Sequence, residues 1–149
     1  MRMREFSRSL PMALLRAREA VMAEFRPILA AHDVTEQQWR VLRALVDEPA
    51  GLGVGQLADA TFLLGPSVSR IIAALEARRL LARSAVDHDG RRAVLTVTAA
   101  GMRLYESIAP ASESAYKRVE QRFGTKQLDQ LYRLLDELTT SQRTSPESR

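Results

Sequence analysis

Residues 53–101 constrain the fold more than any other part of the chain. The hydrophobic periodicity predicts five short elements in close succession, namely a helix over 54–60, a turn at 62–65, a helix over 66–79, and strands at 80–86 and 93–97. Pro66 suits the first turn of a helix, and Asp89-Gly90 between the two strands is a strong hairpin signal. This order of elements is typical of a winged helix-turn-helix.

Longer helices are predicted on both sides of this segment. Residues 12–30 have apolar side chains at helical spacing, with a kink or restart expected at Pro27. Thr35 and Gln38 form the pattern of a capping box that opens the next helix, and Val34 and Trp39 are spaced as its hydrophobic staple. A long helix over 99–123, which Gly124 stops, and a last helix that Thr125 caps complete the set. The sequence thus predicts a mainly α fold with a small β-hairpin wing.

We expect one domain over residues 1–149, because the chain has one domain's length and contains no long linker. Its parts are a winged helix-turn-helix over 35–98, dimerisation helices in 5–30 and 102–142, and a disordered tail over 143–149. The first and last helices carry more apolar surface than one small core needs, which favours a homodimer. Packing within one chain is the alternative.

Composition excludes several classes of protein. The chain has no cysteine, so disulfides and thiolate metal sites are excluded. No apolar run approaches the roughly 20 residues of a membrane span, and the N-terminus lacks a signal-peptide core. We therefore expect a cytoplasmic protein without a membrane partner. Although the net charge is only +4, residues 66–92 carry six arginines against three acidic residues. Such a patch suggests a polyanionic partner, in the first place double-stranded DNA.

The second helix of the helix-turn-helix predicts a surface that can enter a DNA groove. With Val68 facing inward, the outward face consists of small residues and Arg70, flanked by Ser67 and Ser69. Arg70 can bind guanine in the major groove, and the two serines can contact bases or phosphate. Alternatively, the serines cap the helix and Arg70 is merely solvated.

The predicted hairpin tip is basic. Arg91 and Arg92 follow the tight turn, where arginines can reach a narrow minor groove, and His88 can contact a phosphate. Asp89 can orient Arg91 through an ion pair. The alternative is a solvated turn with a weak surface salt bridge. We expect no metal site at residues 87–89, because neighbouring residues of a strand point to opposite faces.

The segment from Asp89 to Gly101 resembles the wing pattern of the MarR family of bacterial transcription regulators, D-x-R followed by an apolar strand and L-T-x-x-G. Val97 stands where leucine is usual, and an acid often found three residues before Asp89 is replaced by Val86. Residues 13–20, 25–28 and 35–40 are similar to the subgroup that regulates homoprotocatechuate (hydroxyphenylacetate) degradation. The resemblance covers about residues 10–142. It implies a homodimer that places two recognition helices in successive major grooves of a near-palindrome, and repression that a small phenolic carboxylate relieves.

An effector of this kind needs a cationic and aromatic pocket. Arg18 falls in the middle of the apolar side of the first helix, so its guanidinium needs a partner, either an internal carboxylate or that of an aromatic effector. Arg16 lies on the far side of the helix and can serve across a dimer seam. His32 and Trp39 can complete the pocket. Alternatively, His32 caps the first helix and Trp39 only serves as the staple.

Two other classes of function are weighed against DNA binding. Catalysis is not expected, since neither of the two histidines has a carboxylate or nucleophile at a useful spacing, and Gly51-Leu52-Gly53-Val54-Gly55 lacks the strand and lysine of a phosphate loop. We expect no cofactor apart from the phenolic carboxylate effector. A winged-helix adaptor that binds proteins instead of specific DNA remains the alternative.

Overall fold

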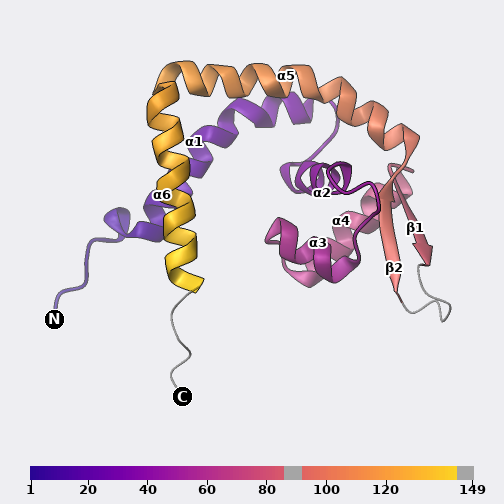
Figure 1. Ribbon diagram of the computed structural model, residues 1–149, viewed down its shortest axis with the longest axis horizontal. Coiled ribbons are helices and arrows are strands. Elements are labelled where there is room, and N and C mark those ends of the chain that lie inside the picture. Colours follow the sequence, from indigo (N-terminus) through magenta and orange to yellow (C-terminus); the bar gives the residue numbers. More distant parts are fainter. Residues whose placement is uncertain (86–91, 144–149) are drawn as a thin grey trace. The chain divides into compact units, whose positions relative to one another are not determined.

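The computed structural model describes residues 1–85 and 92–143. Its elements in chain order are η1 (Phe6–Arg8), α1 (Leu10–Ala30), α2 (Glu36–Val46), α3 (Val54–Thr61), α4 (Gly65–Ala77), β1 (Leu81–Ala85), β2 (Ala93–Val97), α5 (Ala99–Phe123) and α6 (Thr125–Arg143) (Figure 1). The predicted fold class, helices with a two-stranded antiparallel wing, is confirmed. The chain forms two compact units, residues 1–112 and 113–149, and each is described by itself. The single-domain assignment stays a prediction.

The core of the first unit lies among α2, α3 and α4, which pack against one another. Its fully buried side chains come from these helices, from β2 and from α5, and include Val41, Leu42, Leu45, Leu57, Val68, Ile72, Leu75, Leu95 and Ile108. The predicted capping box starts α2. The Thr35 hydroxyl accepts a hydrogen bond from the Gln38 N–H, and the Gln38 side chain accepts one from the Thr35 N–H, both at 3.1 Å. Val34 and Trp39 are buried in the same cluster, as a staple requires.

The axes of α3 and α4 differ by 108°, within the range of a helix-turn-helix. Between them, Phe62 adopts a left-handed conformation with φ of 56°, which a non-glycine residue enters at a cost of about 1–2 kcal/mol. The helix α4 ends at Ala77, two residues before the predicted end, because Arg79 is also left-handed. The N–H of Leu80 then donates to the carbonyl of Leu75 (3.0 Å), which closes a Schellman motif.

The wing is an antiparallel pair in which Leu81 lies opposite Val97 and Ala85 opposite Ala93. Leu52 adds a short bridge to Leu95 on the other edge of β2. The preceding residue must be glycine: Gly51 has φ of 89°, and a Cβ there would lie 2.3 Å from a methyl group of Val94. The connector before α3 is therefore part of the wing.

The T-x-x-G end of the wing pattern ties the base of the wing to α4 and α5. The Thr98 hydroxyl donates to the Arg79 carbonyl (2.7 Å) and accepts from the Gly101 N–H (3.0 Å), so Thr98 caps α5. A Cβ on Gly101 would lie 2.3 Å from the Leu80 carbonyl oxygen, which excludes any larger residue without a shift of the backbone.

The helix α1 begins two residues before the predicted start and continues through Pro27 without a restart. Only the C-terminal end of its apolar side is covered. Phe25 and Leu29 are buried, whereas Leu14 and Val21 are 41% and 40% exposed. In the second unit, α6 has no buried residue within the described part. It ends at Arg143, the first residue of the predicted disordered tail, and residues 144–149 lie outside the described part.

No single helix in the described part of the chain is long and apolar enough to cross a membrane. Within those described residues, α3 and α4 taken together across their bend reach that length and composition.

Candidate DNA-binding surface and effector region

The outward face of α4 carries the predicted recognition residues. Val68 is fully buried, so the opposite side of the helix faces solvent, and Ser69 and Arg70 are exposed while Ser67 is half-buried. An open hollow of about 380 Å³ runs beside this face toward the start of α2, and it is lined by Thr35, Gln37, Gln38, Ser67, Arg70, Ile71 and Ala74. The exposed face is narrow, since apart from Arg70 its side chains are small.

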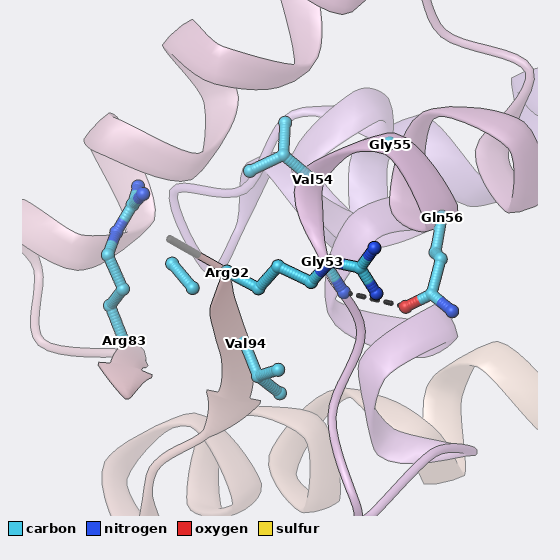
Figure 2. A pocket seen from close by; sticks show the side chains of 8 residues that line it. Gly53, Val54, Gly55, Gln56, Arg83, Arg92 and Val94 are labelled. Carbon is cyan, nitrogen blue, oxygen red and sulfur yellow. Dashed lines mark hydrogen bonds between the residues drawn. The ribbon is translucent and has the colours of Figure 1, made fainter. Parts of the chain in front are cut away.

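A second, larger hollow of about 630 Å³ lies between the start of α3 and the wing. Figure 2 shows Arg92 extending from the start of β2 toward Gly53 and Gln56, with Arg83 apart from it. Gln56 accepts a hydrogen bond from the Gly53 N–H (2.9 Å), which satisfies one donor at this helix start. Arg92 is exposed. The predicted contacts of His88 and Arg91 lie outside the described residues.

Arg83 is held by an ion pair with α4. Its Nη2 lies 2.9 Å from Oε1 of Glu76, and this hydrogen bond raises the pKa of the Arg83 guanidinium. Arg83 is therefore a cation that lines the hollow between the start of α3 and the wing. The ion pair also links β1 to α4.

The partner of Arg18 is an internal carboxylate, one of the two alternatives. The Arg18 side chain is 40% exposed. Its Nη2 donates to Oε1 of Glu36, the first residue of α2. Thus α1 is bound to the start of α2 through a guanidinium and a carboxylate.

Glu36 is the centre of a larger ion-pair network. Its side chain is only 11% exposed and also binds Arg26 (Nε to Oε2, 3.0 Å) and Arg40 (Nη2 to Oε1, 3.5 Å). Burial raises the pKa of Glu36, but hydrogen bonds from Arg18 and Arg26 outweigh it and leave the pKa below its ordinary value. Glu36 is therefore a firmly ionised acceptor.

The network extends to both sides of Glu36. Arg26 also pairs with Glu19 (2.8 Å), and that hydrogen bond lowers the pKa of the Glu19 carboxyl. Arg40 donates from Nη1 to the Thr61 carbonyl (3.1 Å) at the end of α3. A chain of polar contacts thus connects α1, through α2, to the turn before the recognition helix.

The remaining effector candidates are held separately. Trp39 is buried and stacks on Tyr105 of α5, with ring centroids 5.6 Å apart. The half-buried His32 donates from Nδ1 to the Ile28 carbonyl (2.9 Å), as a cap of α1 would. Arg16 donates to the Ser7 carbonyl (3.0 Å) on the exposed side of α1. Neither hollow described above is lined by these side chains or by Arg18.

The sequence interpretation missed Glu36 and two of its arginines. Arg40 follows Glu36 by four residues in one helix, a spacing that favours an ion pair and could have been noticed. Arg18 and Arg26 are 18 and 10 residues from Glu36 and belong to another helix, so no local pattern joins them.

Comparison with known proteins decides the family. The family model described as MarR family matches residues 32–92. The homoprotocatechuate degradative operon repressor of Escherichia coli is 38% identical over 129 residues, which are 87% of this chain and 86% of that protein. The chain belongs to the MarR family. This MarR protein is therefore a transcription regulator and not an enzyme.

Two solved structures of regulators are similar to this MarR protein. NadR in complex with 4-hydroxyphenylacetate is 36% identical, with a TM-score of 0.77 over 93% of this chain and 97% of that one. CouR bound to a 23-mer DNA duplex is 26% identical, with a TM-score of 0.81 over 93% and 98%. MarR regulators bind DNA as dimers and respond to aromatic acid ligands. Within residues 1–85 and 92–143, no cluster of three or more acidic or histidine side chains could hold a metal ion.

Proposed function

We propose that this MarR regulator represses an operon for the degradation of an aromatic acid and releases its operator when a phenolic carboxylate binds. The observation that carries the proposal is the 38% identity to the homoprotocatechuate operon repressor, which extends over 87% of the chain. A match confined to the helix-turn-helix would support DNA binding only. This match is too long for that, and it therefore extends to helices outside the DNA-reading part.

On DNA, the narrow outer face of α4 enters the major groove. Arg70 binds guanine, and Ser67 and Ser69 contact bases or phosphate. Arg92, together with Arg91 and His88, approaches the minor groove and its phosphates from the wing. In a symmetric dimer the two recognition helices reach half-sites about 34 Å apart, one turn of the duplex.

Dimerisation is supported by apolar side chains that remain exposed in a single chain. In α1 these are Leu10, Leu14, Leu15 and Val21, each at least 40% exposed, and in the second unit they include Phe123, Leu131, Tyr132 and Leu134. These side chains lie on α1, α5 and α6, and large contiguous apolar patches are rare on monomeric proteins. Association with a second copy would bury both sets.

For the effector, Arg18 supplies the cation and Trp39 the aromatic surface. A guanidinium has five N–H donors, so Arg18 can bind a second carboxylate while it keeps Glu36. His32 and Arg16 are assigned to the rim, the latter across the dimer seam. We place the regulator in the cytoplasm, where its chromosomal target and the products of its operon would be found.

The proposal is tested by titrating the protein with 4-hydroxyphenylacetate and homoprotocatechuate in a calorimeter. At least one should bind, and Arg18→Ala should abolish the response while DNA binding is kept. Arg133→Ala, which removes an exposed arginine of α6, is the matched control. Full response of Arg18→Ala would place the pocket elsewhere, and loss of folding would make Arg18 a structural residue.

A further inference from the structure

Two large apolar side chains are exposed in the turn that precedes the recognition helix. Phe62 is 85% exposed and Leu64 is 78% exposed, whereas Leu63 between them packs against the core. Proteins usually place Gly, Asn, Asp or Ser at such positions. The turn therefore presents an apolar edge that the fold of the single chain does not use.

The edge is held in place by hydrogen bonds. The Thr61 hydroxyl donates to the Leu57 carbonyl (2.6 Å), and Arg40 donates to the Thr61 carbonyl (3.1 Å). Phe62 then adopts its left-handed conformation, which glycine or asparagine would enter more easily. A phenylalanine at this position costs conformational energy and gains no burial, so its ring is better explained by a contact outside the chain.

The position of the edge identifies the contact. Leu64 is the N-cap of α4, and Phe62 lies two residues before it. In a helix-turn-helix the N-terminal residues of the recognition helix contact the edges of bases in the major groove. The only methyl group that the four bases present in that groove is the 5-methyl of thymine, which apolar side chains contact.

We propose that Phe62 and Leu64 pack against thymine methyl groups beside the bases that α4 reads. This inference rests on the proposed DNA-binding function. A protein partner fits the edge less well. A specific protein interface covers about 800 Å² on each side, while a phenylalanine buries about 150–250 Å². Ser69 and Arg70, which follow the edge in α4, are exposed, polar and suited to bases.

The test compares two versions of one duplex. The wild-type protein first selects a duplex from a random pool. The thymines that the bound protein covers are then replaced by deoxyuridine, which lacks only the methyl group. Binding should weaken about fourfold for each contacted methyl, given about 0.8 kcal/mol for a buried carbon of this kind. Fluorescence anisotropy at one salt concentration measures both duplexes.

Two variants remove the apolar groups without disturbing the turn. Phe62→Asn suits the left-handed conformation, and Leu64→Ser is a favourable N-cap. Each should bind the thymine duplex more weakly and lose discrimination against deoxyuridine, and in the double variant the ratio should approach one. Arg92→Ala is the control: it should weaken both duplexes equally, because the wing approaches the minor groove, where no methyl group lies.

The outcomes separate this inference from the proposed function. Sequence-specific binding by the wild type with equal affinity for both duplexes overturns the methyl contact alone. The methyl contact is also overturned if the variants still prefer the thymine duplex as strongly as the wild type does. If the variants bind both duplexes like the wild type but lose repression in cells, the edge binds a protein partner instead. Failure of the wild type to enrich any sequence from the pool overturns the proposed function together with this inference.

Discussion

Replacing Glu36 with glutamine keeps the shape of the side chain but removes the charge that holds three arginines. The carboxylate is 11% exposed, while its partners are 33–42% exposed and therefore partly screened by solvent. Hydrogen bonds to charged groups contribute about 1.5–3 kcal/mol when buried and less at the surface. We expect Glu36→Gln to lower the free energy of unfolding by about 2 kcal/mol, or the melting temperature by about 4–8 °C for a chain of this size.

The pH dependence gives an independent check. Because the pKa of Glu36 is lowered in the folded state, its stabilisation is present above its unfolded pKa of about 4.3 and disappears as the pH falls through the lower folded value. The difference in stability between wild type and Glu36→Gln should be constant between about pH 6 and 8 and should shrink below about pH 4.

Urea unfolding followed by circular dichroism measures this difference. Protein concentration must be held fixed, because the stability of a dimer depends on it. Glu19→Gln is the control, since Glu19 is about half exposed and should matter much less. The reasoning fails if the two variants lose the same stability, or if the loss caused by Glu36→Gln persists unchanged into the acid range.

Three further predictions concern the wing, the core and the DNA-reading surface. Gly101→Ala forces a Cβ to within 2.3 Å of the Leu80 carbonyl oxygen and should cost about 1–3 kcal/mol in urea unfolding; unchanged stability would contradict the close packing. Ile72→Ala leaves a cavity in the core and should lower the free energy of unfolding by about 2–5 kcal/mol in the same measurement. A loss below about 1 kcal/mol would show that the surrounding side chains close the cavity. In gel shifts, Arg70→Ala should reduce the preference for one base at one position of the operator by about 1–3 kcal/mol. Arg92→Ala should weaken binding to all duplexes alike and reduce the slope of log affinity against log salt concentration by about 0.9. If each variant shows the effect expected of the other, the two assignments are reversed.

The helices of the reading unit could be predicted because their signals are local. Val68, Ile72 and Leu75 recur at helical spacing, and all three are buried. Thr35 and Gln38 are three residues apart, and they form the capping box that was expected. Where the end of an element depends on backbone conformation, the prediction was less accurate. Arg79 adopts a left-handed conformation that ends α4 early, and no residue pattern predicts this conformation for an arginine.

The effector region was harder to predict because it depends on contacts between side chains of different helices. A helical wheel places Arg18 on the apolar side of α1, but it does not show which side chain the guanidinium binds. The partner Glu36 comes from another helix. Likewise, the carbonyl of Thr61, just before the exposed Phe62, accepts a hydrogen bond from Arg40, 21 positions earlier in the chain. Such contacts between distant residues are absent from any local periodicity.

We expect an aromatic acid to release this regulator from a specific operator. Fluorescence anisotropy measures this release on the DNA upstream of the regulator's own gene, with a scrambled duplex as reference, before and after addition of 4-hydroxyphenylacetate or homoprotocatechuate. We predict tight, salt-sensitive binding to the upstream duplex alone and its loss when one of the acids is added. Equal affinity for both duplexes would show that the regulator lacks a specific operator there, and a complex that neither acid weakens would show that these acids are not its effectors.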